Sequence, residues 1–415
     1  MRVIVGEGKE RPQSFLWLFA LAWAGGAIAY VPFLTIWLPL RVVSLAGADS
    51  VRTLGLITFC GAIAASLSNI SFGWLSDRTG IRRPWIAAGL ALTAVLLGLM
   101  GQARDTVAIL ALVVCWQVVL NMMLGPLSAW AADRVPRNKT GLLGGLMALS
   151  PALGALSGII ITIPGFASAQ QRLWLIAAMM CGCVIPALAF APQAPPVSDV
   201  PQPEIVRPPR RFAITMWLAR LLVQIAEAAL FAYLLLYFRS LDPSIDESRV
   251  ARLFGAVLIC AVPLAIGVGT IADRSTHPAR PLALCASCSA LGLVAMLASS
   301  TIEQAMAAYV LFGLATTIFL SVHSGQTLRV LPDPRHRGRD LGLFNLTNTV
   351  PSLIMPWLTI AVVPTRGYAA LFGILALLSA TSAALLFWLK HFEQSPAHGV
   401  TAQGLGELQV QGGSQ

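Results

Sequence analysis

The chain is a series of apolar runs of about twenty residues, separated by short clusters that hold most of its charged side chains. In α-helical geometry, about 20 residues span the ~30 Å hydrocarbon core of a bilayer. Hydrophobic residues make up 57% of the 415 positions and charged residues only 11%, too little polar surface for a water-soluble protein of this size. The runs therefore predict an all-α polytopic membrane protein.

Charge and turn clusters divide the chain into twelve expected transmembrane helices. The predicted spans cover residues 15–40, 53–75, 84–103, 106–131, 141–165, 172–191, 213–238, 250–271, 281–300, 304–328, 340–363 and 367–389. An even number of spans places both termini on the same side of the membrane.

The distribution of basic residues predicts which side that is. The termini and the even-numbered loops hold 19 of the 28 Lys and Arg residues, and cytoplasmic loops carry the positive excess. We therefore expect a multi-pass protein of the inner (plasma) membrane with cytoplasmic termini. The same topology accounts for the net charge of +10, and the lack of basic runs interleaved with aromatic residues argues against a nucleic-acid partner.

A proline-rich segment at the centre divides the chain into halves. Residues 192–212, "PQAPPVSDVPQPEIVRPPRRF", lack apolar periodicity and are rich in a residue that favours extended chain. We predict an N-terminal six-helix bundle over 1–191, a cytoplasmic linker over 192–212, a C-terminal six-helix bundle over 213–392 and a disordered tail over 393–415.

The two halves share a repeated loop. "GWLSDRTGIRRP" in the second loop recurs as "GTIADRSTHPARP" in the eighth, so that Asp77 and Asp273 are 196 residues apart. Pro136 and Pro332 have the same offset. A fixed offset indicates duplicated six-helix units, which many transporters use to form a midplane cavity.

With twelve spans, a central linker and G-x-x-x-D-R-x-G-x-R-R in the second loop, the chain resembles the major facilitator superfamily. The resemblance implies two pseudo-symmetric bundles and a conformational latch on the cytoplasmic side. Asp77 would lie at the N-terminus of a helix in the other half, where an anion is stabilised, and Arg78, Arg82 and Arg83 would pair with acids such as Asp133. The latch residues expected from the motif and its repeat are Gly73, Asp77, Arg78, Gly80, Arg82, Arg83, Asp133, Asp273 and Arg274. The alternative is that topology alone placed the arginines there.

Within that superfamily, "SDRTGIRRPWIAAG" and "GRDLGLFNLTNTVPSLIMP" are similar to the sucrose transporters and the glycoside, pentoside and hexuronide symporters. Those relatives usually carry acids in the first, second or fourth span for ion coupling. This chain has Asn69, Gln117 and Asn121 there instead.

Glu227 is the one acidic residue in the interior of a predicted span. Arg220 and Gln224 share its helical face, and a charged group in hydrocarbon must face a partner or a wet cavity. Its proton affinity would depend on the local solvation and on the nearby guanidinium, so Glu227 is the candidate for proton coupling. Two alternatives stay open: a permanent Arg220–Glu227 bridge that fixes the helix, and an Arg220 that binds an anionic substrate.

Other polar and aromatic residues in the spans are weaker cavity candidates, because hydrogen bonding between helices or simple packing explains them equally well. They are Gln117, Asn121, Trp23, Tyr30, Tyr233, Tyr237, Asn345 and Asn348.

These patterns predict a secondary active transporter that works by alternating access as a monomer and is not an enzyme. We expect no cofactor and no metal, a proton or possibly sodium as the coupling ion, and a small-molecule substrate that is sugar-like. The alternative is a proton-driven exporter of drugs or amphipathic metabolites, which a cavity with few charges would suit.

Overall fold

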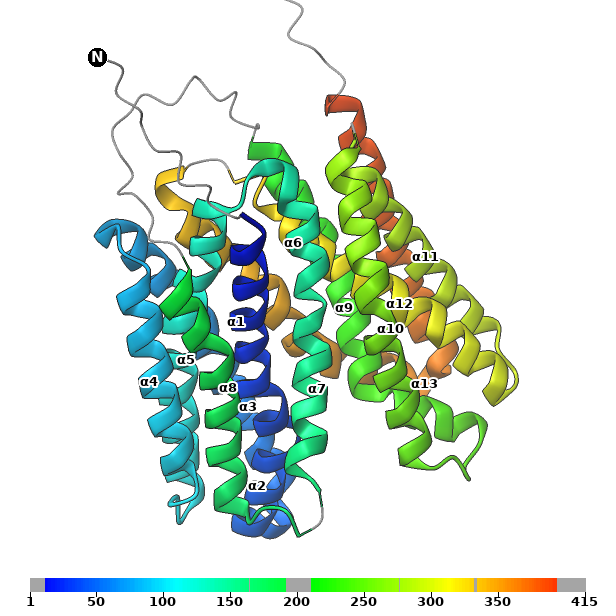
Figure 1. The fold of residues 1–415 in the computed structure, drawn as a ribbon. Coiled ribbons are helices and arrows are strands. Elements are labelled where there is room, and N and C mark those ends of the chain that lie inside the picture. The colour runs from blue at the N-terminus through cyan, green and yellow to red at the C-terminus, as the bar shows by residue number, and fades with distance from the viewer. Residues whose placement is uncertain (1–11, 164, 192–209, 276, 332–333, 394–415) are drawn as a thin grey trace, which may run out of the picture.

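The computed structural model describes residues 12–163, 165–191, 210–275, 277–331 and 334–393 (Figure 1). Most of the predicted linker and tail, at 192–209 and 394–415, lies outside the described residues. The described part is helical throughout, without a β-strand. The all-helical prediction is therefore confirmed.

The N-terminal half contains eight helices that form six spans. They are α1 (Pro12–Pro32), α2 (Leu38–Ala46), α3 (Ser50–Thr79), α4 (Arg83–Met100), α5 (Thr106–Arg134), α6 (Thr140–Met147), α7 (Leu149–Ile161) and α8 (Ala169–Phe190). A π-helical turn, Phe33–Trp37, joins α1 to α2 in one span. It follows Pro32, which lacks the backbone donor of a regular helix.

The C-terminal half contains the other six spans in five helices. They are α9 (Arg210–Leu241), α10 (Glu247–Arg274), α11 (Ala279–Ala298), α12 (Ile302–Thr327) and α13 (Arg337–Glu393). Gly367 interrupts α13 with φ 72°, a left-handed conformation that glycine adopts without strain. The kink separates the predicted eleventh and twelfth spans.

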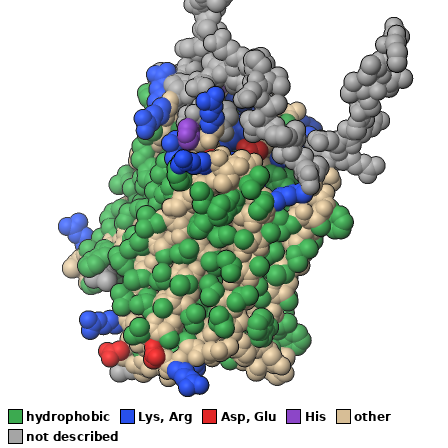
Figure 2. Space-filling view, turned by 90° about the vertical axis from the view of Figure 1, so that its left-hand side faces the viewer, with side chains coloured by type: hydrophobic (Ala, Val, Ile, Leu, Met, Phe, Trp, Pro, Cys, Tyr) green, Lys and Arg blue, Asp and Glu red, His purple; other side chains and the backbone are tan. Residues whose placement is uncertain are grey.

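Eleven helical segments of the described chain are long and apolar enough to cross a bilayer. The first part of α13 supplies the remaining span of the predicted twelve. Figure 2 shows hydrophobic side chains covering the middle of one face, with charged side chains gathered towards its two ends. Large exposed apolar residues such as Trp357, Phe190 and Val107 suit a lipid-facing surface.

Side chains that determine local structure explain several helix starts. Asp105 caps α5 by accepting a hydrogen bond from the Ala108 N–H at 2.7 Å. Ser168 and Gln171 form a reciprocal capping box at the start of α8. Inside the N-terminal bundle, Trp116 and Phe33 are fully buried and their ring centroids lie 4.6 Å apart.

The two bundles meet along α3 with α13 and along α6 with α10 and α12. Figure 1 shows the bundles converging at the end where α6 begins and diverging at the opposite end. We call the converging end, which holds the loops after α3 and α10, the latch end. At mid-height, the hydroxyl oxygens of Ser66 on α3 and Thr349 on α13 are 2.8 Å apart.

Candidate functional site

Asp77 joins the end of α3 to the start of α13. Its two carboxylate oxygens accept hydrogen bonds from the backbone N–H groups of Gly338 and Arg339, each at 3.0 Å. The first N–H groups of a helix have no partner within the helix and carry partial positive charge. Asp77 thus binds the N-terminus of a helix in the other bundle, the position that the resemblance implies.

Asp273 makes the equivalent contact from the end of α10 to the start of α6. It accepts hydrogen bonds from the N–H groups of Gly141 and Leu142, both at 2.7 Å. Arg329 donates to the same carboxylate at 2.6 Å and also to the Thr140 hydroxyl in the other bundle. The repeated loop of the sequence therefore forms two related contacts between the bundles.

Glycines let the helix ends approach closely at both contacts. A Cβ on Gly73 would overlap the carbonyl group of Gly338, and a Cβ on Gly338 would lie 2.9 Å from the carboxylate of Asp77. A Cβ on Gly141 would overlap the carbonyl group of Gly269 in the same way. Any larger residue at these positions would separate the bundles at the latch end.

Asp133, at the end of α5, receives two arginines. Arg82 donates from Nε to Asp133 at 3.0 Å and from Nη2 to Asp77 at 2.7 Å. Arg337, at the start of α13, pairs with Asp133 at 3.2 Å. Asp133 therefore belongs to an ion-pair network that crosses between the bundles.

The other arginines of the motif differ from the expected pairing. The Arg78 guanidinium lies over the Trp74 ring, 5.5 Å from its centroid, and does not pair with Asp133. Arg83 donates to the carbonyl oxygen of Ala191 and lies over Trp130 at 5.4 Å. Each aromatic face supplies the negative electrostatic potential that an acid was expected to supply.

Two residues expected in the latch play other parts. Gly80 ends α3 in the left-handed conformation, with φ 69°, which makes it a helix terminator. The side chain of Arg274 is exposed, and Arg329 pairs with Asp273 in its place.

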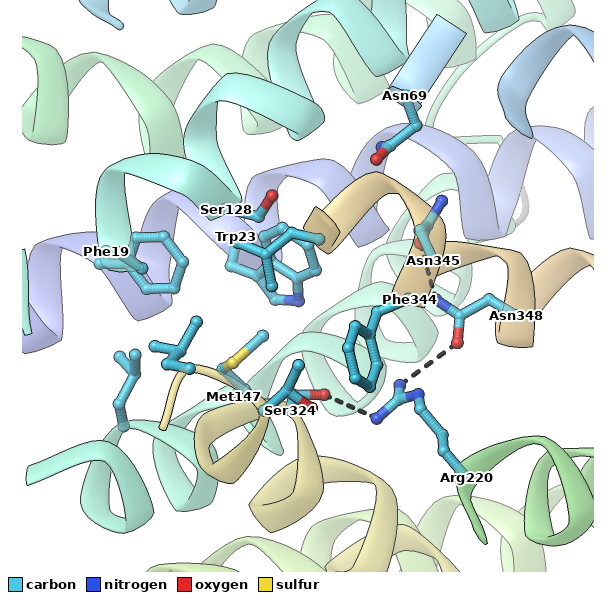
Figure 3. A pocket seen from close by; sticks show the side chains of 15 residues that line it. Phe19, Trp23, Asn69, Ser128, Met147, Arg220, Ser324, Phe344, Asn345 and Asn348 are labelled. Carbon is cyan, nitrogen blue, oxygen red and sulfur yellow. Dashed lines mark hydrogen bonds between the residues drawn. The ribbon is translucent and has the colours of Figure 1, made fainter. Parts of the chain in front are cut away.

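A pocket lies between the bundles close to the latch end (Figure 3). It encloses about 590 Å³, counting the solvent at its mouth. Its wall comes from α1, α3, α5 and α6 on one side and α9, α12 and α13 on the other. Apolar and aromatic side chains dominate, and the polar ones are Asn69, Ser128, Arg220, Ser324, Thr327, Asn345 and Asn348.

Among the described residues that line this pocket, Arg220 is the only charged one. Its Nη1 donates to the Leu320 carbonyl oxygen and the Ser324 hydroxyl, each at 3.0 Å. Its Nε donates to the Thr347 hydroxyl at 3.1 Å, and its Nη2 to Asn348 Oδ1 at 3.2 Å. Every one of these acceptors is neutral.

Glu227 lies two turns further along α9 and is half-buried. Its carboxylate accepts a hydrogen bond from Gln224 Nε2 at 2.8 Å. Within the described chain, no ion pair joins Glu227 to Arg220, so the permanent bridge that the sequence left open is absent. Tyr30 of α1, a cavity candidate from the sequence, does not line the pocket among its described residues and is partly exposed.

The amides of α3 and α5 bond to each other. Asn69 donates to Asn121 at 2.9 Å, and Asn121 donates to the carbonyl oxygen of Gln117. All three residues are buried. Asn69 also lines the pocket, whereas Gln117 and Asn121 lie behind it in the packed helices.

The aromatic candidates divide in the same way. Trp23 lines the pocket and stacks on Phe19, with ring centroids 6.1 Å apart. Tyr237 is buried in the C-terminal bundle, where its hydroxyl donates to the Met296 carbonyl oxygen at 2.9 Å. Tyr233 lies next to it in a small cavity apart from the main pocket. The pocket thus contains Trp23 but neither of the two tyrosines of α9.

Sequence reasoning missed Ser324, Thr347 and Arg329. Single hydroxyl residues in a span give no signal, because they commonly bond to their own helix. Arg329 did have a signal: it follows Asp133 by 196 positions, the offset of the repeat. The same alignment would have marked this arginine as part of the second latch.

Comparison with known proteins identifies the fold family. The model of the Major Facilitator Superfamily matches residues 6–156 and 216–411. The chain belongs to this superfamily. It is accordingly a transporter and not an enzyme.

A curated relative in the superfamily is the multidrug resistance protein MdtG of Serratia proteamaculans (strain 568). The two chains are 25% identical over 392 residues, which cover 89% of this chain and 92% of the relative. Among solved structures, the human organic anion transporter MFSD10 (TETRAN) has a TM-score of 0.72 at 12% identity, covering 91% of this chain and all of that one. The proton:xylose symporter XylE has a TM-score of 0.65 at 13% identity, covering 91% and 96%. At these identities the two structures show a shared fold.

Proposed function

We propose that this superfamily member carries small amphipathic molecules across the inner (plasma) membrane by alternating access, coupled to protons. The observation that carries the proposal is Glu227. It is the one acid near the middle of a described span, and it lies on the same helix as the pocket residue Arg220. No cation of the described chain forms an ion pair with it, and its hydrogen-bond partner is Gln224. A carboxylate in such a place can bind and release a proton without breaking a structural bridge.

The character of the pocket favours an amphipathic substrate over a sugar. Phe19, Trp23, Met147, Leu143 and Phe344 line it, and apolar walls with few polar groups suit an apolar ligand. The name of the relative MdtG supports the same class and supports export as the direction.

A sugar-like substrate, the first expectation from the sequence, remains the second candidate. Asn69, Asn345 and Asn348 present neutral amides to the pocket, and amides of this kind bond to hydroxyl groups. Membership of the sucrose-transporter branch stays a prediction.

The basic loops support an orientation with the latch end in the cytoplasm. The structure closed by Asp77 and Asp273 is then the outward-facing state. Alternating access would require both aspartates to leave their helix N-termini before the pocket opens to the cytoplasm.

Proton coupling is tested by imposing a pH gradient across membrane vesicles and measuring whether a probe accumulates inside them. The probes are ethidium, rhodamine 6G, 2-naphthoate, sucrose and xylose. We expect accumulation of at least one amphipathic probe against its gradient, and Glu227→Gln should abolish that accumulation while leaving exchange at equal concentrations. Glu303→Gln, which changes an exposed acid at the start of α12, is the matched control. Unchanged accumulation in Glu227→Gln would refute the coupling role, and a sodium gradient that replaces the pH gradient would reassign the ion.

A further inference from the structure

Arg220 is a cation held by neutral groups at the edge of an apolar pocket. The guanidinium stays charged at any physiological pH and has five N–H donors. Thr347, Ser324 and Asn348 take one donor each and the Leu320 carbonyl oxygen takes another. One N–H of Nη2 is left without a partner among the described residues, on the side chain that lines the pocket.

The hydrogen bonds fix the guanidinium in place without neutralising it. A buried cation is commonly paired with an acid because an unpaired charge in a low-dielectric region is costly. Here the nearest acid on the same helix, Glu227, bonds to Gln224 instead. The positive charge of Arg220 therefore remains available to a ligand in the pocket.

The opposite wall is aromatic. In Figure 3, Phe19 and Trp23 enter the pocket from α1, across from Arg220, Ser324 and Asn348. The two rings of α1 are stacked at an interplanar angle of 20°, so they present a flat apolar surface. Phe344 of α13 adds a third ring to the lining.

The indole of Trp23 and the guanidinium of Arg220 come from equivalent positions of the two repeated halves. Trp23 precedes Arg220 by 197 positions, and Tyr30 precedes Glu227 by 197. The final prolines of the two repeated loop sequences are related by the same offset. Both residues of the first pair are half-buried. At equivalent positions of their first spans, one half thus brings an indole to the pocket and the other a guanidinium.

We propose that Arg220 and Trp23 form a two-part recognition site for an organic anion with a flat apolar body. The carboxylate or sulfonate group of the ligand binds the guanidinium, and its ring lies against the indole. The inference rests on the proposed transport through this pocket and names the substrate class. The competing interpretation is that Arg220 only fastens α9 to α12 and α13.

The test measures ligand binding to the purified full-length protein, so that it is independent of proton coupling. The probes are 2-naphthoate, its neutral isostere 2-naphthamide and the cation 2-naphthylmethylammonium, titrated by isothermal calorimetry. We expect 2-naphthoate to bind at least about tenfold more tightly than the amide, as a hydrogen bond to a charged group implies. Equal affinities for the acid and the amide, or tighter binding of the ammonium probe, would overturn the proposal without any variant.

Variants locate the site. Arg220→Gln should remove the preference for 2-naphthoate over 2-naphthamide and leave weak binding of both. Arg220→Lys should keep part of the preference, since it keeps the charge but not the planar fork. Arg104→Gln, an exposed arginine in the loop before α5, is the matched control and should bind like the unchanged protein.

Trp23→Ala covers the case in which Arg220→Gln fails to fold. It should weaken the acid and the amide by the same factor, because both share the ring. A preference for 2-naphthoate that survives in folded Arg220→Gln, or unchanged affinity in Trp23→Ala, would contradict the proposed site. Unchanged accumulation in Glu227→Gln vesicles would instead refute only the proton-coupling role of Glu227.

Discussion

Arg329 and Asp273 form an ion pair at 2.6 Å. In the repeat, Arg329 occupies the position that corresponds to Asp133 in the first half. In the first half, an acid at this position is linked to Asp77 through Arg82. In the second half, a base at this position binds the latch aspartate directly. In both latches, an aspartate binds the N-terminus of a helix in the other bundle. They differ at the equivalent position of the repeat, where the first latch has the acid Asp133 and the second the base Arg329.

The difference matters because it decides which substitution opens which latch. Asp77 is held by the N-terminus of α13 and by Arg82, which belongs to the same bundle as Asp77. Arg337 adds an ion pair across the bundles, to Asp133. Asp273 is held by the N-terminus of α6 and by Arg329. Opening the latch end requires both sets to break together.

Asp77→Asn should shift the population towards forms open at the latch end. It removes the charge that binds the α13 N-terminus and pairs with Arg82, and we expect the closed state to lose about 1–2 kcal/mol. Spin labels at Asn138 and Arg280, both exposed near the latch end, report the distance between the bundles by double electron–electron resonance after the seven native cysteines are replaced. An unchanged distance distribution would contradict the latch assignment.

Gly73→Ala should separate the bundles at the latch end because the new Cβ would overlap the Gly338 carbonyl. Gly55→Ala is the matched control on the same helix, where a Cβ meets nothing within 4 Å. The same spin-label pair should report longer distances for Gly73→Ala only. If both variants behave alike, close approach at Gly73 does not hold the latch closed.

Arg82→Gln should destabilise the closed state more than Arg78→Gln does. Arg82 pairs with both Asp77 and Asp133, whereas Arg78 contributes a single contact over Trp74, worth about 0.5–1 kcal/mol at an exposed site. Accessibility of a cysteine at Leu341 in the pocket to a thiol reagent added from the latch side measures the effect. Equal labelling rates for the two variants would remove Arg82 from the network.

Asn121→Ala should lower the thermal stability of the protein without altering the opening of the latch. It leaves the buried amide of Asn69 without its acceptor, at a cost of about 0.6–2 kcal/mol for a hydrogen bond between helices in a membrane. The unfolding temperature in detergent, followed by a thiol-reactive dye, should fall by a few degrees. An unchanged unfolding temperature would show that the amide pair contributes nothing measurable.

Much of the fold follows from the sequence because the bilayer fixes the length of each apolar run. The break at Gly367, the division into halves and the repeat at Asp77 and Asp273 could all be read from spacing. The π-helical turn at Phe33–Trp37 and the division of the fifth span between α6 and α7 could not. They arise from local backbone geometry and packing that leave the hydropathy pattern unchanged.

The pocket was less predictable. The sequence indicates Glu227 and Arg220 because charge in a span is rare, whereas it gives Trp23 only as one of several weaker cavity candidates. The partners of Arg220, Ser324 and Thr347, come from helices more than 100 positions further along the chain. Thr347 lies in a segment that resembles the sucrose-transporter branch, but neither hydroxyl gives a sign in the sequence that it binds Arg220. Only the packing of the three helices brings these side chains together.

The central claim is that the two bundles move apart at the latch end during each transport cycle. Ser66 and Thr349 offer the most direct test, since their side-chain oxygens are 2.8 Å apart across the interface. Ser66→Cys with Thr349→Cys, in a chain without its native cysteines, allows a disulfide to join α3 to α13. Transport of an amphipathic probe into proteoliposomes should stop on oxidation and return on reduction, while each single variant is unaffected by oxidant. Full transport by the oxidised, cross-linked protein would contradict the account.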